Sequence, residues 1–496
     1  MSNIDLLSGL QGFRDYYPEY WREINYILNN MRNVSRSYGY LEYEGPSLER
    51  VELIEAKSGA DLIKEIFTLT DRNDSRLLLR PEQTPTLARM LAKEQQRYKR
   101  PIRWFSIPRL FRDETVQKGR EREFWQLNVD ILGEESVSAD AEVIAVAVDI
   151  IREVGLEDKQ FNMFVNHREL LNSFINSITK INPQKLIPII DKRLSLIQSE
   201  ITDILKNEGK SERESEELGL LYRRILISSG EFKKKLLSNA KELTQLLENE
   251  DEISEKVMVR ELVKNGLKEE NALKLYNLTN IKGPPSQFIK AINNLNLPKE
   301  CVDVIEKLEV LGTYLDGFGV GESIIFDASL ARGLDYYTGV VFEAFDSTGQ
   351  IVRAICGGGR YDDLVSDIGG GTQLKGTGFG MGELVLLELA KLNDVITEKN
   401  DIIDLYLVPI KKGSIPFILK LATELRKNFS VRCNPYPWKI NKHFEYADDN
   451  HFNLMIFAGP KDITNNQISV RKVETGDNFT LVIDEKLEEN LKKLLD

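Results

Sequence analysis

The sequence predicts an α+β fold: an antiparallel sheet flanked by helices, a helical insertion, and a C-terminal α/β domain. Three observations predict it. Short runs with alternating apolar residues cluster in the first third of the chain, the middle is rich in Leu, Ile, Lys and Glu with little strand signal, and strands alternate with helices near the end. With 496 residues the chain is too long for one hydrophobic core, so several domains are expected.

The first expected elements are a helix from about Tyr17 to Tyr38, where apolar residues recur at helical spacing, and an extended segment that ends at Pro46. Short alternating runs follow and suggest an antiparallel sheet, and a broad apolar face then predicts another helix. The strands are expected around Leu77–Leu79, Arg103–Ile107 and Phe124–Ile131, and the helix over Ala139–Val154.

The middle of the chain is expected to be a helical insertion. Apolar residues there keep spacings of four and three from Ile190 through Leu194, Ile197 and Ile201 to Ile204, which predicts one helix-pairing seam. The highly charged stretch Lys206–Glu217 predicts an exposed turn. Strand signal returns at Ser323–Ala328 and Val340–Ala344, so the sheet is expected to resume there.

A polar segment at Glu398–Asp401 is expected to link the last domain, which alternates strands and a helix. Strands are predicted at Asp404–Pro409, Leu454–Ala458, Gln467–Lys472 and Thr480–Ile483, and a helix at Ile415–Phe429. The expected domains are therefore the two parts of the sheet core, residues 1–180 and 317–397, the insertion at 181–316, and the C-terminal domain at 401–496.

The amino-acid composition indicates which classes of protein are compatible with this chain. The hydrophobic content of 42% and the charged content of 29% are ordinary for a soluble globular protein. No apolar run approaches the ~20 residues of a membrane helix, and no secretion signal is recognised, so a cytoplasmic protein is expected. Three scattered cysteines and three histidines predict neither a disulfide framework nor a protein-held metal. The net charge of −12 disfavours general nucleic-acid binding but allows a local basic face.

The stretch from Arg109 to Gly133 carries the most specific chemistry. Phe111–Glu114 is expected to end one strand, and a second strand would place Phe124, Gln126, Asn128 and Asp130 on one face. The Arg112 guanidinium suits a phosphate and the Phe124 ring suits a base. Gln126 and Asp130 suit a smaller polar substrate. An exposed hairpin with solvated charges is the alternative interpretation of this stretch.

This stretch resembles motif 2 of the class II aminoacyl-tRNA synthetases, in the form found in the histidyl-tRNA synthetase family. Four further segments, in the order of that family, support the resemblance. They are Gly12–Asp15 (the opening signature), Leu79–Pro85 (the substrate-amine loop), Leu330–Gly339 (the histidine-specific peptide) and Gly357–Asp362 (the glycine-rich strand turn). Lys442–Asp448, followed by apolar Leu454–Gly459, resembles the anticodon-binding domain of related synthetases, although a packing domain without ligand is the alternative.

The resemblance implies ATP-dependent ligation of L-histidine to tRNA(His), with Mg²⁺ accompanying the nucleotide, in a homodimer whose interface contains the first helix and strand. Arg112 and Arg332 are implied to neutralise the α-phosphate during catalysis, although ion pairs with Glu114 or Asp335 are the structural alternative. Glu114, Arg120 and Phe124 complete the implied ATP-binding set.

Histidine recognition requires partners for the ammonium, the carboxylate and the imidazole. The resemblance assigns Glu82, Thr84 and Asp130 to the ammonium and Gln126 to the carboxylate. Tyr336, Tyr337 and Tyr361 are the candidates for the imidazole, with core packing as their alternative. If Tyr336 and Tyr337 lie in one strand, one of them must point away from the pocket, which favours Tyr337 or Tyr361.

The sequence departs from the family in motif 3, Gly378–Leu386. The arginine that normally stacks on adenine and reaches the outer phosphate is replaced by Val385, and Arg120, Arg122 and Arg360 are the candidates for compensation. Two other functions therefore stay open: a non-catalytic paralogue that regulates histidine biosynthesis, and an RNA-binding scaffold. The retained histidine-specific peptide and C-terminal domain favour the ligase.

Overall fold

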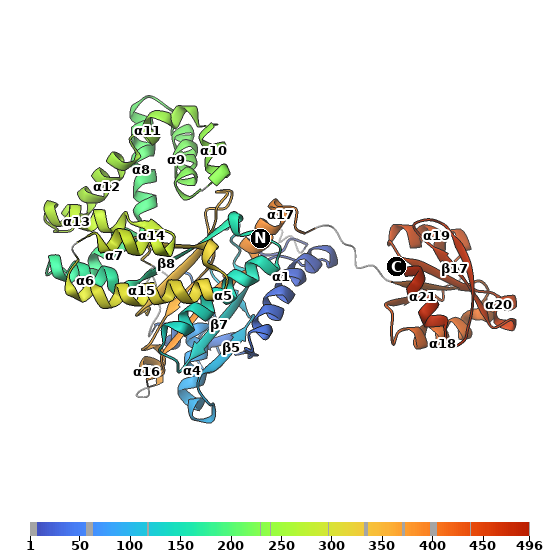
Figure 1. Cartoon of the computed structure of the whole chain (residues 1–496). Coiled ribbons are helices and arrows are strands. Elements are labelled where there is room, and N and C mark those ends of the chain that lie inside the picture. Colours follow the sequence, from blue (N-terminus) through green and yellow to red (C-terminus); the bar gives the residue numbers. More distant parts are fainter. Residues whose placement is uncertain are drawn as a thin grey trace. The chain divides into compact units, whose positions relative to one another are not determined.

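The computed structural model describes residues 7–55, 63–116, 119–228, 230–238, 240–295, 297–331, 336–369, 373–396, 404–436 and 438–495. The chain forms two compact units, Met1–Val395 and Ile396–Asp496, each with its own sheet (Figure 1). Within the described ranges, none of the helices combines the length and the apolar character needed to cross a membrane.

The first unit is built on a ten-stranded sheet with the order β1-β5-β7-β13-β12-β11-β8-β10-β9, and β6 pairs with β7. All pairs are antiparallel except β1–β5 and β8–β10, so the expectation of an antiparallel core is confirmed. The strands are β1 (Leu41–Glu42), β5 (Ile102–Ser106), β6 (Arg109–Phe111), β7 (Glu123–Leu132), β8 (Phe161–His167), β9 (Lys282–Gly283), β10 (Ile324–Asp327), β11 (Val340–Asp346), β12 (Ala354–Arg360) and β13 (Gly376–Gly382).

Helices cover this sheet because their apolar stripes need a partner surface. The face of α1 with Ile24, Ile27 and Met31 is fully buried, and α5 is apolar nearly all round, as befits a helix between the sheet and other helices. A separate three-stranded antiparallel sheet, β2-β4-β3, also belongs to the first unit. These elements are α1 (Pro18–Ser37), β2 (Leu48–Arg50), α2 (Val51–Glu55), β3 (Thr68–Thr70), β4 (Arg76–Leu79), α4 (Thr84–Glu94), η1 (Gln95–Arg97), α5 (Val137–Glu153), η2 (Asp158–Gln160), α6 (Arg168–Ile178), η4 (Gly321–Ser323), α16 (Leu364–Gly369) and α17 (Glu383–Leu392).

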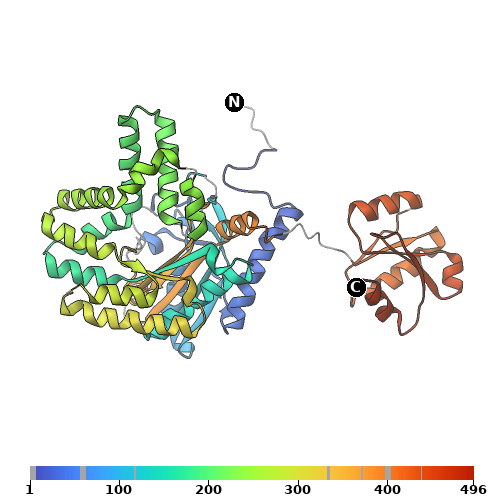
Figure 2. The same ribbon diagram turned by 45° about the horizontal axis from the view of Figure 1, so that its top comes forward.

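The middle of the chain is helical, as expected from its composition. Figures 1 and 2 show these helices at the opposite side of the first unit from α1. Ile197, Ile201, Leu205 and Tyr222 form the buried core between α8 and α9. The elements are α7 (Pro183–Asp191), α8 (Arg193–Asn207), α9 (Glu212–Ile227), α10 (Gly230–Ser238), η3 (Lys241–Leu243), α11 (Thr244–Glu248), α12 (Glu250–Lys264), α13 (Glu269–Thr279), α14 (Pro285–Asn293) and α15 (Lys299–Gly317).

Two local expectations for this region were wrong. The seam expected from Ile190 to Ile204 is divided between two helices, because α7 ends before Lys192 and α8 begins after it. The turn expected over Lys206–Glu217 is shorter, because Ser211 caps a new helix by accepting a hydrogen bond from the Glu214 amide. The charges of Glu212–Glu217 are therefore on a helix surface instead of in a loop.

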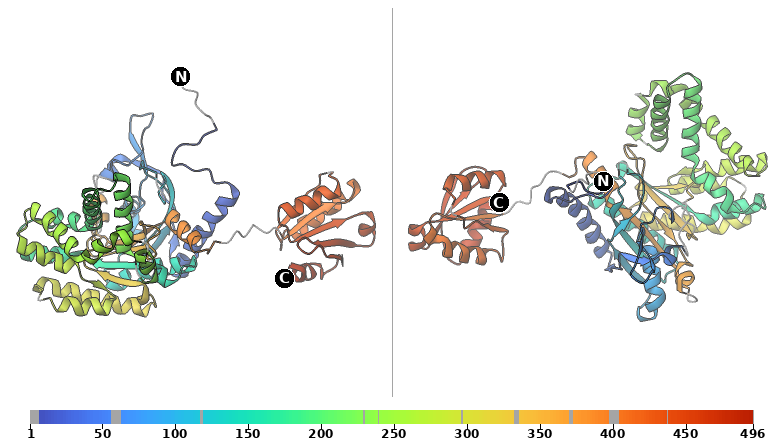
Figure 3. Two further views of the ribbon diagram at one scale, coloured as in Figure 1. Left: turned by 90° about the horizontal axis from the view of Figure 1, so that it is seen from above. Right: turned by 180° about the vertical axis from the view of Figure 1, so that it is seen from behind.

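The second unit is a five-stranded sheet with the order β15-β14-β16-β17-β18, parallel at β14–β15 and β14–β16 and antiparallel elsewhere. Leu405 and Ile456 share a hydrophobic core with residues of α18 and α21, and Tyr406 and Met455 share a second core with Ala447 of α19. Figure 3 shows helices on both faces of this sheet. The elements are β14 (Leu405–Pro409), η5 (Lys412–Ser414), α18 (Ile415–Leu425), β15 (Val431–Cys433), α19 (Ile440–Asp449), β16 (Leu454–Ala458), α20 (Pro460–Thr464), β17 (Gln467–Lys472), β18 (Asn478–Val482) and α21 (Leu487–Leu495).

Candidate active site

Strand β7 forms the centre of the site. Its alternating residues bring Phe124, Gln126 and Asp130 to one face, as the sequence pattern predicts, and Gln126 donates a hydrogen bond to Asn128 at 3.0 Å. The preceding strand was expected to run to Glu114, but β6 ends at Phe111. Arg112 and Glu114 therefore lie in the connection between β6 and β7. Their side chains there do not have to alternate between the two faces of a sheet. Gln117 and Lys118 of this hairpin lie outside the described residues.

Asp130 is a buried carboxylate on this strand. The Tyr361 hydroxyl donates a hydrogen bond to its Oδ1 atom, and Asp130 itself is only 2% exposed. Burial raises the pKa of Asp130 to about 7, and the hydrogen bond from Tyr361 opposes that rise. Burial also raises the pKa of Tyr361 well above its usual value, so its hydroxyl remains a donor. The pair provides a poorly solvated negative site that a cationic substrate group can complete.

Glycines of β13 make room for these side chains. A Cβ atom on Gly378 would lie 2.2 Å from Asp130 Oδ1, and one on Gly380 would lie 2.6 Å from Gln126 Nε2. At Gly376 the obstructed group would be the Tyr361 ring, at 2.6 Å. Any larger residue at these three positions of β13 would displace a polar side chain, so the glycines leave the space that these side chains occupy.

The three tyrosines that were candidates for imidazole recognition lie together. Tyr336 and Tyr337 precede β11 and are not part of a strand, so the strand alternation expected to turn one of them away does not apply. Their ring centroids are 4.9 Å apart, and the Tyr336 and Tyr361 centroids are 6.1 Å apart. Tyr337 and Tyr361 are both buried in the cluster that contains Trp104 and Val341.

The loop before α4 carries Glu82 and Thr84. Buried Arg80 fixes it by donating hydrogen bonds to Glu44 Oε1 at 2.8 Å and to the Gly45 carbonyl at 2.7 Å. Arg112 donates from Nε to the Pro81 carbonyl at 3.0 Å, which ties this loop to motif 2. Glu82 is buried and Thr84 begins α4. The loop and the β7 connection thus hold each other in place.

A cavity opens next to Gln126, between β7, the start of β12 and the first turn of α17. The Arg112 guanidinium lies over the Phe124 ring, 5.3 Å from its centroid, and buried Glu114 pairs with Arg120 and, at 3.9 Å, with Arg112. Cations, carboxylates and an aromatic ring therefore meet around one space. The cavity is lined by Arg112, Glu114, Gly119, Arg120, Glu121, Phe124, Gln126, Arg353, Ala354, Ile355, Cys356, Gly357, Gly380, Gly382, Glu383, Leu384 and Val385.

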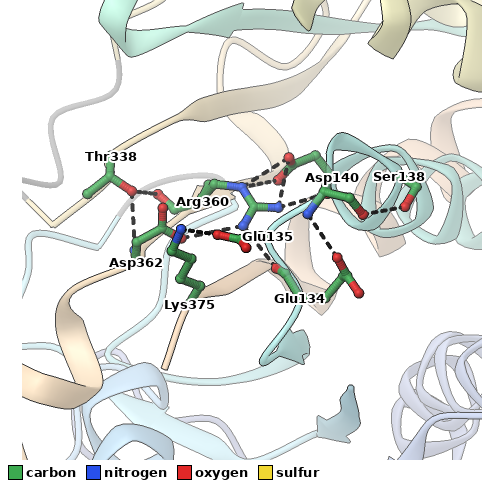
Figure 4. A network of polar contacts seen from close by, with 9 residues as sticks. Glu134, Glu135, Ser138, Asp140, Thr338, Arg360, Asp362 and Lys375 are labelled. Atoms are coloured by element: carbon green, nitrogen blue, oxygen red, sulfur yellow. Dashed lines mark hydrogen bonds and ion pairs between the residues drawn. The ribbon is translucent and has the colours of Figure 1, made fainter. Parts of the chain in front are cut away.

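The two other cations considered as substitutes for the motif 3 arginine have different surroundings. Arg360 is 6% exposed and pairs with Asp140 at 2.9 Å. It also donates hydrogen bonds to the backbone carbonyls of Glu134 and Ser136. Figure 4 shows Arg360 beside Asp140 and Glu134. Arg122 pairs with Asp113 at 3.1 Å and donates to the Glu114 carbonyl. Neither side chain lines the cavity, because both are engaged in holding backbone segments together.

Sequence reasoning missed several residues of this site and one expected residue is not described. Arg332, expected in catalysis, lies outside the described residues, which omit 332–335. Arg353 and Glu383 line the cavity, and the Asp130 charge acts on nearby Tyr43. Arg353 precedes a glycine-rich strand, so a search for cations flanking that strand could have found it. Tyr43 carried no sequence signal beyond its place in the expected motif 1.

A mostly antiparallel sheet that presents a motif 2 hairpin, a glycine-lined floor and a cation-rich cavity is the catalytic architecture of a class II aminoacyl-tRNA synthetase. The histidyl-tRNA synthetase family profile matches residues 12–257 and 215–383, and an anticodon-binding domain profile matches residues 404–494. The chain belongs to the histidyl-tRNA synthetase family.

Individual relatives agree over nearly the full chain. A histidine–tRNA ligase of Leptospira biflexa is 30% identical over 491 residues, which cover 97% of this chain and 98% of the relative. A histidine–tRNA ligase of Pyrococcus horikoshii is 29% identical over 493 residues, 99% of this chain and 100% of the relative. The crystal structure of histidyl-tRNA synthetase from Nostoc sp. shares the fold with a TM-score of 0.74 and 22% identity, covering 98% and 99% of the two chains.

Proposed function

We propose that the chain ligates L-histidine to tRNA(His) through a histidyl-adenylate intermediate, using ATP. The carrying observation is that Gln126 both lines the cation-rich cavity and shares the β7 face with buried Asp130. A nucleotide in the cavity and an amino acid over Asp130 would therefore meet at Gln126. Strand β7 would thereby contact both ATP and histidine.

The reaction has two displacements. A carboxylate oxygen of histidine attacks the α-phosphorus of ATP, and the bond from that phosphorus to the bridging oxygen breaks as pyrophosphate leaves. The tRNA ribose hydroxyl then attacks the acyl carbon and AMP leaves. Because the first nucleophile is already ionised, positioned cations contribute more than a general base. Arg112 and Arg332 are proposed for this task, the latter on sequence resemblance alone.

The substrates are proposed to contact residues on three sides. Phe124 stacks on adenine, while Glu114 and Arg120 contact the remainder of the nucleotide. The histidine ammonium binds Asp130, Glu82 and Thr84, and its carboxylate binds Gln126. The imidazole is placed among Tyr336, Tyr337 and Tyr361, where the Asp130–Tyr361 hydrogen bond supports a polar ring environment.

Mg²⁺ is proposed to arrive with the nucleotide. The Glu114, Glu121 and Glu383 carboxylates line the cavity, and carboxylate oxygens are ligands that Mg²⁺ prefers. Among the described residues no three such side chains are grouped as a metal site, so the phosphates of the nucleotide would themselves hold the ion. Buried Glu383 has a pKa raised to about 8 by its burial, so a divalent cation nearby would favour its ionised form. When bound, the ion would supply charge neutralisation at the outer phosphates.

The second unit is proposed to bind the anticodon stem of tRNA(His). Its support is an aromatic and cationic surface made by Arg432, Tyr436, Trp438, Lys442 and Tyr446. Lys442 Nζ lies 4.5 Å from the Trp438 ring centroid, and the Trp438 and Tyr446 centroids are 5.5 Å apart. Tyr436 is 59% exposed. Stacking rings beside cations suit unpaired bases and their phosphates.

We place the protein in the cytoplasm as a homodimer, with residues 1–180 and 317–397 as its catalytic core, 181–316 as an insertion and 401–496 as the anticodon-binding domain. The dimer is supported by β1, an edge strand of the large sheet on which Leu41 is 67% exposed. Light scattering should give twice the chain mass, and Leu41→Glu should shift the equilibrium to monomer. A stable, active wild-type monomer would contradict the dimer.

Amino-acid-dependent exchange of pyrophosphate into ATP tests the proposed function. With each standard amino acid supplied separately, histidine should support exchange and the others should not. Exchange with a different amino acid would overturn the substrate assignment. Absence of exchange with all of them would favour a regulatory subunit or an RNA-binding scaffold over a ligase.

A further inference from the structure

Arg353 is a half-buried cation directly before β12, and it lines the cavity together with Arg112 and Arg120. The pairing of β12 with β13 places Arg353 near the first turn of α17. Strands β12 and β13 pair with Cys356 opposite Met381, so the chain three residues before Cys356 runs toward the residues that follow β13. Those residues, Glu383–Val385, form the first turn of α17 and line the same cavity.

The side chains of Arg353 and Val385 flank one spot in the cavity. A Cβ atom built on Gly119 would lie 3.5 Å from Val385 Cγ2 and 3.9 Å from Arg353 Cδ. An arginine at position 385 and the arginine at position 353 would thus reach into the same space. Arg353, from the segment directly before β12, therefore lies near the space that an arginine at position 385 would occupy.

Arg353 lies close to two other cations of the cavity, Arg112 and Arg120. Among the residues that the structure describes, none forms a hydrogen bond or ion pair with its guanidinium. Burial lowers the pKa of Arg353, and the neighbouring Arg112 lowers it further. The positive charge of Arg353 also lowers the pKa of Arg120. A half-buried arginine that faces two other arginines is unfavourable without an anion, and a polyphosphate would relieve the repulsion.

The other candidates already have partners. Arg120 pairs with Glu114, Arg122 with Asp113, and Arg360 with Asp140. Binding through any of these guanidiniums would first require an existing pair to break or to be shared. Arg353 can contact a phosphate without that loss, and its planar fork of donors can do so bidentately.

We propose that Arg353 binds the outer phosphates of ATP and replaces the arginine that is missing at Val385. This inference rests on the proposed function. The proposal names the phosphates instead of the adenine ring because Arg353 lies close to Arg112, which is proposed for the α-phosphate, and to Arg120, which is proposed for the part of the nucleotide beyond the adenine.

The test compares Arg353→Ala, Arg353→Gln and Arg353→Lys in histidine-dependent pyrophosphate exchange. Because a hydrogen-bonded charge typically contributes ~1.5–3 kcal/mol, the ATP KM should rise about 10- to 100-fold in the two neutral variants. Arg353→Lys should show a smaller rise, and the histidine KM should stay within about twofold in all three. Arg152→Ala is the control. Arg152 is a partly exposed arginine of α5 that pairs with Asp158 and does not line the cavity, so its replacement should change neither the ATP KM nor the histidine KM.

Inhibition by AMP separates the outer phosphates from the rest of the nucleotide. AMP competes for the site but lacks both outer phosphates, so its inhibition constant should be the same in Arg353→Gln and the wild type. An equal weakening of AMP and ATP would overturn the proposal, because it would place Arg353 at the adenine or the α-phosphate. Inorganic pyrophosphate, used as a product inhibitor, should weaken together with ATP.

Restoring the usual arginine provides a second, independent arm. The double variant Arg353→Gln with Val385→Arg should recover a substantial part of the lost ATP affinity, because the new guanidinium reaches the same space. An unchanged ATP KM in Arg353→Gln, in an enzyme whose wild type exchanges pyrophosphate, would overturn this inference and leave the proposed function intact. A wild type without exchange would instead overturn the proposed function.

Discussion

The Tyr361 hydroxyl donates a hydrogen bond to the carboxylate of Asp130, and both groups are buried on the face of the sheet where histidine is proposed to bind. Asp130 is in β7 and Tyr361 directly follows β12, and these strands are not neighbours because β13 lies between them. Contact across β13 is possible only because Gly376 and Gly378 leave its surface open. The glycine-rich strand β13 thus permits this hydrogen bond because its glycines have no side chains.

The first prediction concerns pH. Burial raises the pKa of Asp130 to about 7, so its carboxylate is mostly protonated below pH 7 and cannot attract an ammonium group. The histidine KM should therefore rise as pH falls from 8 to 5.5. The imidazole of the substrate and ATP titrate in the same range, so Asp130→Asn is the control: its KM should be high throughout and should lack the Asp130 component. Identical pH profiles for the two enzymes would remove Asp130 from the site.

Tyr361→Phe sharpens that test. The hydrogen bond from Tyr361 lowers the pKa of Asp130, so its loss should move the rise in histidine KM to higher pH. The raised pKa of Asp130 also affects the free energy of unfolding. The folded state keeps a proton on Asp130 that the unfolded chain releases above about pH 4. The contribution of Asp130 to the free energy of unfolding should therefore fall as pH rises from about 4 toward 7. Removal of the charge in Asp130→Asn should abolish that contribution in urea unfolding.

The second prediction concerns Arg332. Its alanine variant should lose a cation that acts mainly in the transition state, so kcat for adenylate formation should fall by ~10²–10³ while histidine binding changes little. Single-turnover formation of the adenylate is the measurement. Unchanged adenylate formation in Arg332→Ala would reject the assignment.

The third prediction separates a structural arginine from a nucleotide-binding one. Arg360 and Asp140 form a buried ion pair (Figure 4). Arg360 also donates hydrogen bonds to the Glu134 and Ser136 carbonyls. Arg360→Ala would leave the Asp140 carboxylate buried without its partner, so the free energy of unfolding should fall by about 3–5 kcal/mol. Arg213→Ala, which removes an exposed pair with Glu217, should leave it almost unchanged. A raised ATP KM with normal stability would instead make Arg360 the compensating cation.

The sequence predicts the elements of this site better than the contacts between them. The alternation of Gln126 and Asp130 is a property of one strand, and the apolar stripe of α1 is a property of one helix, so both can be read locally. The proximity of Arg353 to Val385 depends on the register of β12 against β13 and on where α17 begins. The break at Lys192 is likewise not marked by a glycine or proline at the junction. Such non-local relationships require the folded chain.

The last prediction concerns the second unit. Trp438 lies under the Lys442 ammonium and beside the exposed Tyr436 ring, so it is the proposed centre of the tRNA-binding surface. Because stacking of one base on an aromatic ring is worth ~1–3 kcal/mol, Trp438→Ala should raise the KM for tRNA(His) in charging about tenfold or more. Histidine-dependent pyrophosphate exchange needs no tRNA and should be unchanged.

The control variant is Phe479→Ala. It removes an aromatic ring that is 36% exposed on β18, an edge strand of the same sheet, and it should affect neither reaction. Charging should also weaken as salt rises, despite the acidic total charge, because phosphate contacts release counterions. Equal loss of charging and exchange in Trp438→Ala would mean that this unit supports the fold of the enzyme instead of binding tRNA.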